Sequence, residues 1–91
     1  MLNRQMSRIV WGNRALRPVD KLVLLALVQL CPFDSDRAIT PLRYLAHLTC
    51  LGIPAVHRSV RTLEAGGYIT RYQHHRRAPT EYVVHPHLAT R

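Results

Sequence analysis

Residues 49–69, TCLGIPAVHRSVRTLEAGGYI, constrain the fold of this chain more than any other stretch. Apolar side chains recur there at near-helical spacing, which predicts a helix with one face in a core. They are Leu51, Val56, Val60 and Leu63. Gly52 takes the cap position before this helix, Pro54 lies in its first turn, and the helix is expected to end near Ala65. The Gly66–Gly67 pair that follows supplies a residue able to adopt a positive φ.

Cationic side chains occupy the other faces of this expected helix. His57, Arg58 and Arg61 fall outside the apolar stripe, so they are predicted to point outward. We therefore expect an amphipathic helix over residues 54–65 that packs on one side and presents positive charge on the other.

The charge of the whole chain is unbalanced in the same direction. Thirteen Lys and Arg residues, twelve of them arginine, stand against five acids, for a net charge of +8. Glu64 is the only acid between Asp36 and Glu81, a region that also holds seven arginines. They are Arg37, Arg43, Arg58, Arg61, Arg71, Arg76 and Arg77. This excess favours a polyanion as partner, because arginine binds phosphate and guanine edges; the alternative is a merely basic surface.

The length and the cysteines limit the class of protein. Ninety-one residues make one small domain with a modest core. Cys31 and Cys50 are not spaced as a CxxC pair and lie in apolar surroundings, so we expect buried free thiols. Arginines interrupt the N-terminal region, and no apolar run reaches the roughly 20 residues that span a bilayer, so a cytoplasmic protein is expected.

The N-terminal third predicts an arm followed by an unusually apolar helix. Residues 1–15 are interpreted as an arm whose apolar island, residues 9–11, forms a short strand or an anchor. Pro18 opens a helix with Asp20 near its positive end, and the helix closes at residues 30–32. Its expected core stripe consists of Val19, Leu22, Val23, Ala26, Leu27 and Leu30.

Three further apolar residues of this helix lie outside that stripe and need a cover. Either the apolar island or a second copy of the chain can supply one. The second possibility predicts a homodimer interface made of Trp11, Leu24, Leu25 and Val28.

The remaining elements are predicted from caps and β-rich runs. Residues 38–39 form a brief strand, and Thr40 is expected to cap a short helix that begins at Pro41 and runs to about Thr49. Residues 68–74 and 80–84 are rich in β-branched and aromatic residues, which favours two antiparallel strands joined by a basic tip at residues 75–79.

This order of elements resembles the winged helix-turn-helix family of DNA-binding domains. The run over residues 49–69 is similar to a T-G-L-S-x-x-T-V-x-R-A-L-x-x-L-E-x-x-G-L-I pattern in that family. The resemblance implies an α+β fold over residues 16–84, a three-helix core with a C-terminal two-stranded β-hairpin wing, followed by a tail over residues 85–91. Residues 7–11, SRIVW, followed by residues 21–27, KLVLLAL, are similar to the start of helix-turn-helix proteins of phages and mobile elements, including replication-organiser-like proteins. Two departures are Gly52 in place of a Ser or Thr cap and an apolar first helical turn over residues 53–55.

The resemblance implies double-stranded DNA as the partner, read by residues 54–65 and gripped by a wing at residues 74–78, with the protein as a homodimer. The candidate DNA-binding residues are Arg43, Ala55, His57, Arg58, Arg61, His75, Arg76 and Arg77. Any one of the cations could instead contact only phosphate or solvent. The implied role is a transcriptional regulator or a replication or partition factor of a phage or mobile element. The alternative is a protein-interaction subunit of a larger nucleoprotein assembly.

Catalysis and metal binding are not expected. The chain has no recognisable nucleophile with its base and orienting acid, no glycine-rich phosphate loop and no carboxylate pair. Histidines at positions 74, 75, 85 and 87 could approach one another, but neither cysteine is spaced to complete a tetrahedral site. We therefore predict no enzyme, no metal and no cofactor.

Overall fold

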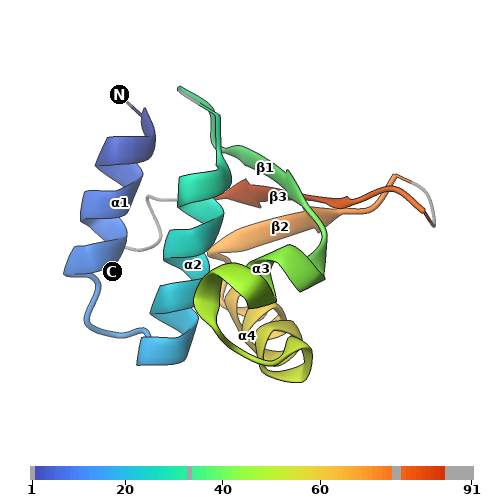
Figure 1. Cartoon of the computed structure of the whole chain (residues 1–91). Helices are drawn as coiled ribbons and strands as arrows, with labels where there is room; N and C mark the ends of the chain where they lie inside the picture. The colour runs from blue at the N-terminus through green and yellow to red at the C-terminus, as the bar shows by residue number, and fades with distance from the viewer. Residues whose placement is uncertain (1, 33, 75–76, 86–91) are drawn as a thin grey trace.

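The computed structural model describes residues 2–32, 34–74 and 77–85, in which four helices accompany a three-stranded antiparallel sheet (Figure 1). The elements are α1 (Leu2–Gly12), α2 (Pro18–Leu30), β1 (Arg37–Thr40), α3 (Leu42–Thr49), α4 (Ile53–Ala65), β2 (Ile69–Tyr72) and β3 (Thr80–Val84). The predicted α+β class is confirmed. No helix of the described residues is both long and apolar enough to cross a membrane.

The sheet has the order β1-β3-β2, so β3 lies in the centre and pairs with both neighbours. Tyr82 is the register partner of Ala38 on one side and of Arg71 on the other. The two C-terminal strands are therefore part of a three-stranded sheet and do not form a separate two-stranded unit. β1 joins because its side chains alternate, with Ala38 and Thr40 buried and Arg37 and Ile39 exposed.

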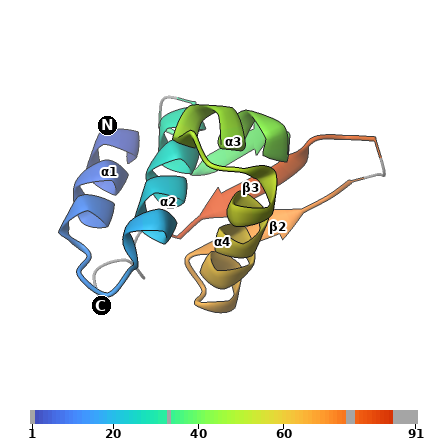
Figure 2. The ribbon, with the colours of Figure 1, turned by 60° about the horizontal axis from the view of Figure 1, so that its bottom comes forward.

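The N-terminal segment is a helix, and the expectation of a short strand at residues 9–11 is wrong. Met6 and Val10, four residues apart, are fully buried, and α1 lies alongside α2 (Figure 2). Trp11, the bulkiest residue of the apolar island, is 67% exposed. Asn13 terminates the helix, since its side-chain oxygen accepts hydrogen bonds from the backbone N–H groups of Ala15 (2.8 Å) and Leu16 (3.0 Å).

The buried face of α2 differs from the predicted stripe. Leu24 and Val28 are buried in the core of the chain, whereas Val19 and Leu22 are 40% and 42% exposed. The assignment of Leu24 and Val28 to a dimer interface is therefore wrong. α1 supplies the cover that the second face of α2 needed. The sequence could not show which face of α2 packs, because a helix that is apolar nearly all round has no polar face to indicate it.

The predicted helix ends are largely confirmed. α2 begins at Pro18, Gly52 is the N-cap of α4, and Gly67 adopts a φ of 81° after α4 ends. The predicted capping by Thr40 is wrong, because its hydroxyl donates to the carbonyl of Pro41 (3.2 Å), and α3 has no side-chain cap.

The two cysteines differ in environment. Cys31 is buried at the end of α2, as predicted, and its thiol donates to the carbonyl of Leu27 (3.4 Å). Cys50 is exposed, which contradicts the prediction, and follows α3 with a φ of 58°. A thiol in the left-handed turn between α3 and α4 points away from the apolar faces that pack together.

Candidate nucleic-acid interface

Helix α4 presents its basic residues to solvent, as its sequence predicts. Its inner face is buried and consists of Val56, Ser59, Val60 and Leu63. His57, Arg58 and Arg61 are exposed, and Ala55 is half-buried. His57 and Arg58 precede Arg61 by four and three positions, so the three side chains lie on neighbouring parts of one face of the helix.

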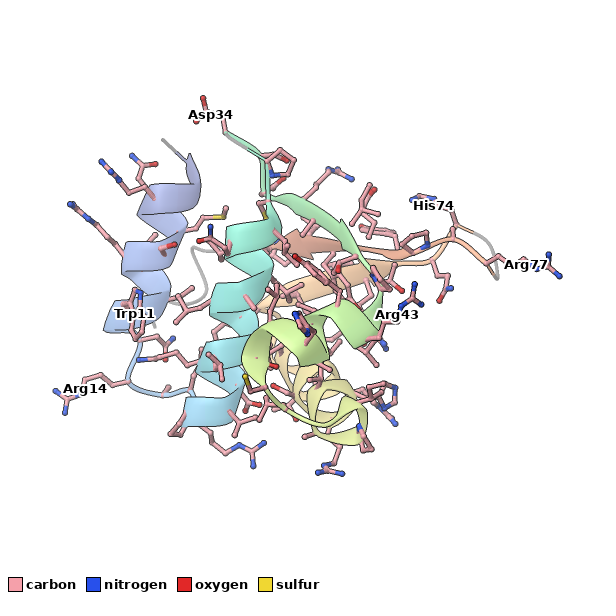
Figure 3. All side chains as sticks on the ribbon, viewed as in Figure 1. Trp11, Arg14, Asp34, Arg43, His74 and Arg77 are labelled. Carbon is pink, nitrogen blue, oxygen red and sulfur yellow. The ribbon has the colours of Figure 1, made fainter. Side chains whose placement is uncertain are left out.

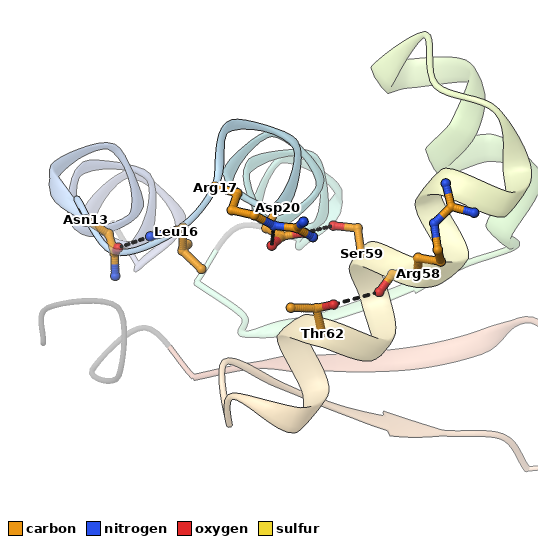
Figure 4. Close-up of polar contacts among 7 residues, drawn as sticks. All are labelled: Asn13, Leu16, Arg17, Asp20, Arg58, Ser59 and Thr62. Carbon is orange, nitrogen blue, oxygen red and sulfur yellow. Dashed lines mark hydrogen bonds and ion pairs between the residues drawn. The ribbon is translucent and has the colours of Figure 1, made fainter.

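A buried polar bridge fixes α4 against the start of α2 (Figure 4). The Asp20 carboxylate, only 2% exposed, accepts a hydrogen bond from the Ser59 hydroxyl (2.7 Å) through Oδ1. Its Oδ2 accepts one from Nε of Arg17 (3.1 Å). A buried carboxylate is costly unless its oxygens are hydrogen-bonded, so this bridge favours one position of α4 relative to α2.

Arg58 borders a depression between α4 and the start of α2. The depression is lined by Arg17, Pro18, Val19, Ala55, Arg58 and Ser59. The backbone of Arg58 is held within α4, where its carbonyl accepts a hydrogen bond from the Thr62 hydroxyl (3.0 Å; Figure 4). Two predicted site residues, Ala55 and Arg58, thus lie together at this end of the molecule.

A second depression brings Arg43 and Arg77 together. It lies between the start of α3 and the connection from β2 to β3, and its lining includes Pro41, Arg43, Gln73, Arg77 and Pro79. Both arginines lie toward the same end of the molecule (Figure 3). The side-chain amide of Gln73 donates to the carbonyl of Ala78 across the connection (3.3 Å). Predicted residues His75 and Arg76 lie outside the described residues.

Two arginines of the region between Asp36 and Glu81 form ion pairs within the chain. Arg37 pairs with Glu81 (2.7 Å), and Arg71 donates to a single oxygen of Glu64 through two nitrogens (2.9 and 3.1 Å). Hydrogen bonds from these arginines lower the pKa of both carboxyl groups.

The other histidine and arginine side chains of this region differ in their partners. His74 lies 3.6 Å from Glu81, an ion pair when the imidazole is protonated, and His85 hydrogen-bonds Thr70 (2.6 Å). Within the described part of the chain, Arg43, Arg58 and Arg61 form no ion pair. Arg43 and Arg58 therefore keep their charge for an external anion, whereas Arg61 also lies close enough to Glu64 to help lower the pKa of its carboxyl group.

Sequence reasoning missed the Asp20–Ser59 bridge. Ser59 lies on the same face as Val56, Val60 and Leu63, and a hydroxyl in a core stripe indicates a buried polar partner. Four of the candidate residues fall into two groups, Ala55 and Arg58 beside α2, and Arg43 and Arg77 beside α3, while His57 and Arg61 border neither depression. No known family model matches this chain, and no curated protein does either.

Proposed function

We propose that this protein binds duplex DNA, with α4 entering the major groove and the β2–β3 connection serving as a wing along the phosphate backbone. The observation that carries this proposal is the division of α4 into a fixed inner face and a basic outer strip. Asp20 and Ser59 fix the inner side, and the outer side carries Arg58 and Arg61 without ion-pair partners among the described residues.

The dimensions and chemistry of α4 suit direct reading of bases. An α-helix with its side chains is about 10–12 Å across, and the major groove is about 12 Å wide. Arg58 or Arg61 could each bind the O6 and N7 acceptors of a guanine, a contact worth roughly 1–3 kcal/mol of discrimination against another base. The half-buried methyl of Ala55 suits a thymine methyl at the start of the helix.

Arg43 and Arg77 suit a different kind of contact. They border one depression at the start of α3, where the helix N-terminus adds positive potential. Two arginines from elements far apart in the sequence could hold one stretch of DNA backbone and set the register of α4 in the groove.

In the cell, such a protein would serve as a transcriptional regulator or as a replication or partition factor of a phage or mobile element. The DNA-binding role rests on the resemblance of residues 49–69 to the winged helix-turn-helix pattern, and the phage or mobile-element setting rests on the resemblance of residues 7–11 and 21–27.

The proposal is tested with two double variants that remove equal charge from different helices. Arg58→Ala/Arg61→Ala changes α4, and Arg4→Ala/Arg8→Ala changes two exposed arginines of α1. α2 lies between these two helices (Figures 1 and 2). Duplexes selected from random DNA by the native chain are labelled, and binding is measured by fluorescence anisotropy at several salt concentrations.

We expect native affinity to fall with salt, with a log–log slope of about −0.9 per phosphate neutralised. The α4 variant should lose most of its preference for selected over random duplexes, while the α1 variant should keep it. Equal losses in the two variants would mean that net charge alone drives binding. Absence of duplex binding by the native chain at low salt would refute the proposal.

A further inference from the structure

We propose that an exposed apolar groove formed by α1, α2 and α3 binds an acidic amphipathic helix of a partner protein. Its lining includes the apolar residues Trp11, Leu22, Leu25 and Leu48, together with Ala26 and Gln29. The groove is independent of the proposed DNA contacts. None of its residues borders either depression described above.

The apolar side chains of the groove are too exposed to be explained by the core of the chain. Trp11 is 67% exposed, and Leu22 and Leu48 are each 42% exposed. They come from three different helices and line one open groove of ≈ 280 Å³. A contiguous apolar surface of this size on a small domain is often functional, whereas single exposed apolar residues need no explanation.

Three cations, Arg8, Arg14 and Lys21, lie near Trp11 and form what we call the cationic border of the groove. The Lys21 ammonium donates to the carbonyl of Trp11 (3.0 Å), and Arg14 follows Trp11 in the loop after α1 (Figure 3). Arg8 precedes Trp11 by three positions, so it lies on the same side of α1.

Three of the five acids of the chain are engaged away from the groove. No acidic residue lines the groove among the described residues. Asp20 faces Ser59, and Glu64 and Glu81 pair with arginines of the sheet. A partner with acidic residues beside its apolar anchors would complement this border.

A second copy of the chain fits this surface less well. Two copies joined through the groove would bring Arg14 and Lys21 of each near the same cations of the other, which costs free energy. The exposed parts of Trp11, Leu22 and Leu48 amount to on the order of 300 Å². Standard interfaces bury about 800 Å² on each partner, whereas one helix seated in a groove needs only a few anchors.

The arrangement of the groove suits a helix as the occupant. Leu22, Leu25, Ala26 and Gln29 follow the i, i+3, i+4, i+7 spacing along α2 and would lie beneath the apolar stripe of a docked helix. Trp11 at one end provides a large aromatic anchor of the type that dominates binding energy. Because Trp11 and Arg77 lie at opposite ends of the molecule, such a partner leaves the β2–β3 connection uncovered (Figure 3).

The test uses Trp11 as its own reporter, since it is the only tryptophan of the chain. The probe is a designed helical peptide of roughly 15 residues, about four turns, with leucines on one face and glutamates on the other. A matched peptide carries lysines in place of the glutamates. We expect the acidic peptide to shift Trp11 emission to shorter wavelength in a saturable manner, and the lysine peptide to bind at least about tenfold more weakly.

Two serine variants locate the binding site. Leu22→Ser removes an anchor of the groove, and Ile39→Ser removes an equally apolar side chain that is 65% exposed on β1. Leu22→Ser should weaken binding of the acidic peptide about tenfold, the loss expected for part of a buried leucine. Ile39→Ser should leave it unchanged. Trp11→Ala, followed through a dye on the peptide, gives a second groove variant, and circular dichroism checks that each variant is folded.

Three outcomes would overturn the proposal. They are no emission shift with the acidic peptide, binding that Leu22→Ser and Trp11→Ala leave unchanged, and equal binding of the two peptides. A blue shift that grows with protein concentration alone, together with a dimer in sedimentation, would also overturn it by assigning the groove to a second copy.

Discussion

At the scale of single residues, Asp20 and Ser59 explain how a small core can orient a helix. Apolar packing of Val56, Val60 and Leu63 has little direction of its own, because such contacts tolerate small rotations. A 2.7 Å hydrogen bond to a buried carboxylate tolerates much less. The rotation of α4 about its own axis, and with it the position of Arg58 and Arg61 relative to α2, therefore depends on a polar contact that is not itself exposed.

We predict that Ser59→Ala lowers the free energy of unfolding by about 1–3 kcal/mol, because it leaves a buried carboxylate oxygen without this donor. A double-mutant cycle with Asp20→Asn, measured by urea denaturation, should give a coupling of at least about 0.5 kcal/mol. Thr62→Ala is the control, since its exposed hydroxyl bonds only within α4, and it should cost less than about 0.5 kcal/mol. Additive effects of Asp20→Asn and Ser59→Ala would contradict the bridge.

The cysteines provide a second contrast between residues of the same type. Burial, with a smaller contribution from Asp36, raises the pKa of the Cys31 thiol to about 11. At pH 8 only roughly a thousandth of such a thiol is ionised, and its burial further limits access. Cys50 is exposed in the turn between α3 and α4.

We therefore predict that an aromatic disulfide reagent at pH 8 modifies one thiol rapidly in the folded protein and a second only after unfolding. Absorbance of the released thiol gives the count. Cys50→Ser should abolish the rapid phase and leave the slow one. Two rapid phases in the native chain would contradict the burial of Cys31.

At the scale of elements, the sequence pattern predicted neither the helix α1 nor the face of α2 that packs. The spacing and end signals of α2, α3 and α4 predict their bounds closely, because proline and glycine act locally on φ and on backbone N–H groups. The sequence did not predict α1, because only Met6 and Val10 of its described side chains are fully buried. Two such positions are too few to form a recognisable apolar pattern. Which face of α2 packs was set by α1, an element that the pattern did not reveal.

Because Leu24 lies on the buried face of α2 and Leu22 on its exposed face, the same substitution at these two positions should have very different effects on stability. Leu24→Glu places a carboxylate in the core, which should cost on the order of 5 kcal/mol and unfold so small a domain. Leu22→Glu, on the exposed side, should change stability by less than about 1 kcal/mol. Thermal unfolding followed by circular dichroism distinguishes them. If the Leu24→Glu protein stays folded and only changes from a dimer to a monomer, Leu24 would lie at the dimer interface that the sequence first suggested.

At the scale of the whole molecule, the positive charge is divided among surfaces with different partners. Arg37 and Arg71 support the sheet through Glu81 and Glu64. The outer strip of α4 and the depression at Arg43 and Arg77 form the proposed DNA surface, and the cationic border of the groove comes from α1, the loop after it and α2. A net charge of +8 therefore overstates the charge available to any single partner.

If DNA is the partner, the two arginine groups should differ in their effects on binding. Arg43→Ala/Arg77→Ala should weaken binding to all duplexes and reduce the magnitude of the log–log salt slope by about two, as expected for phosphate contacts. Arg58→Ala or Arg61→Ala should instead relax preference at particular base pairs, by roughly 1–3 kcal/mol. Anisotropy titrations on a panel of single-base variants separate the two patterns. Uniform weakening by Arg58→Ala and Arg61→Ala would show that α4 contacts only the backbone.

The sequence by itself determined the α+β class, the ends of α2 and α4 and the outward direction of Arg58 and Arg61, because these depend on residues within a few positions of one another. Only the tertiary structure decided that Met6 and Val10 cover α2, that Asp20 meets Ser59, and that Arg43 and Arg77 border one depression. Each of these arrangements joins residues far apart in the chain. Their formation depends on how whole helix and sheet faces pack together, which the spacing of residues within one segment does not predict.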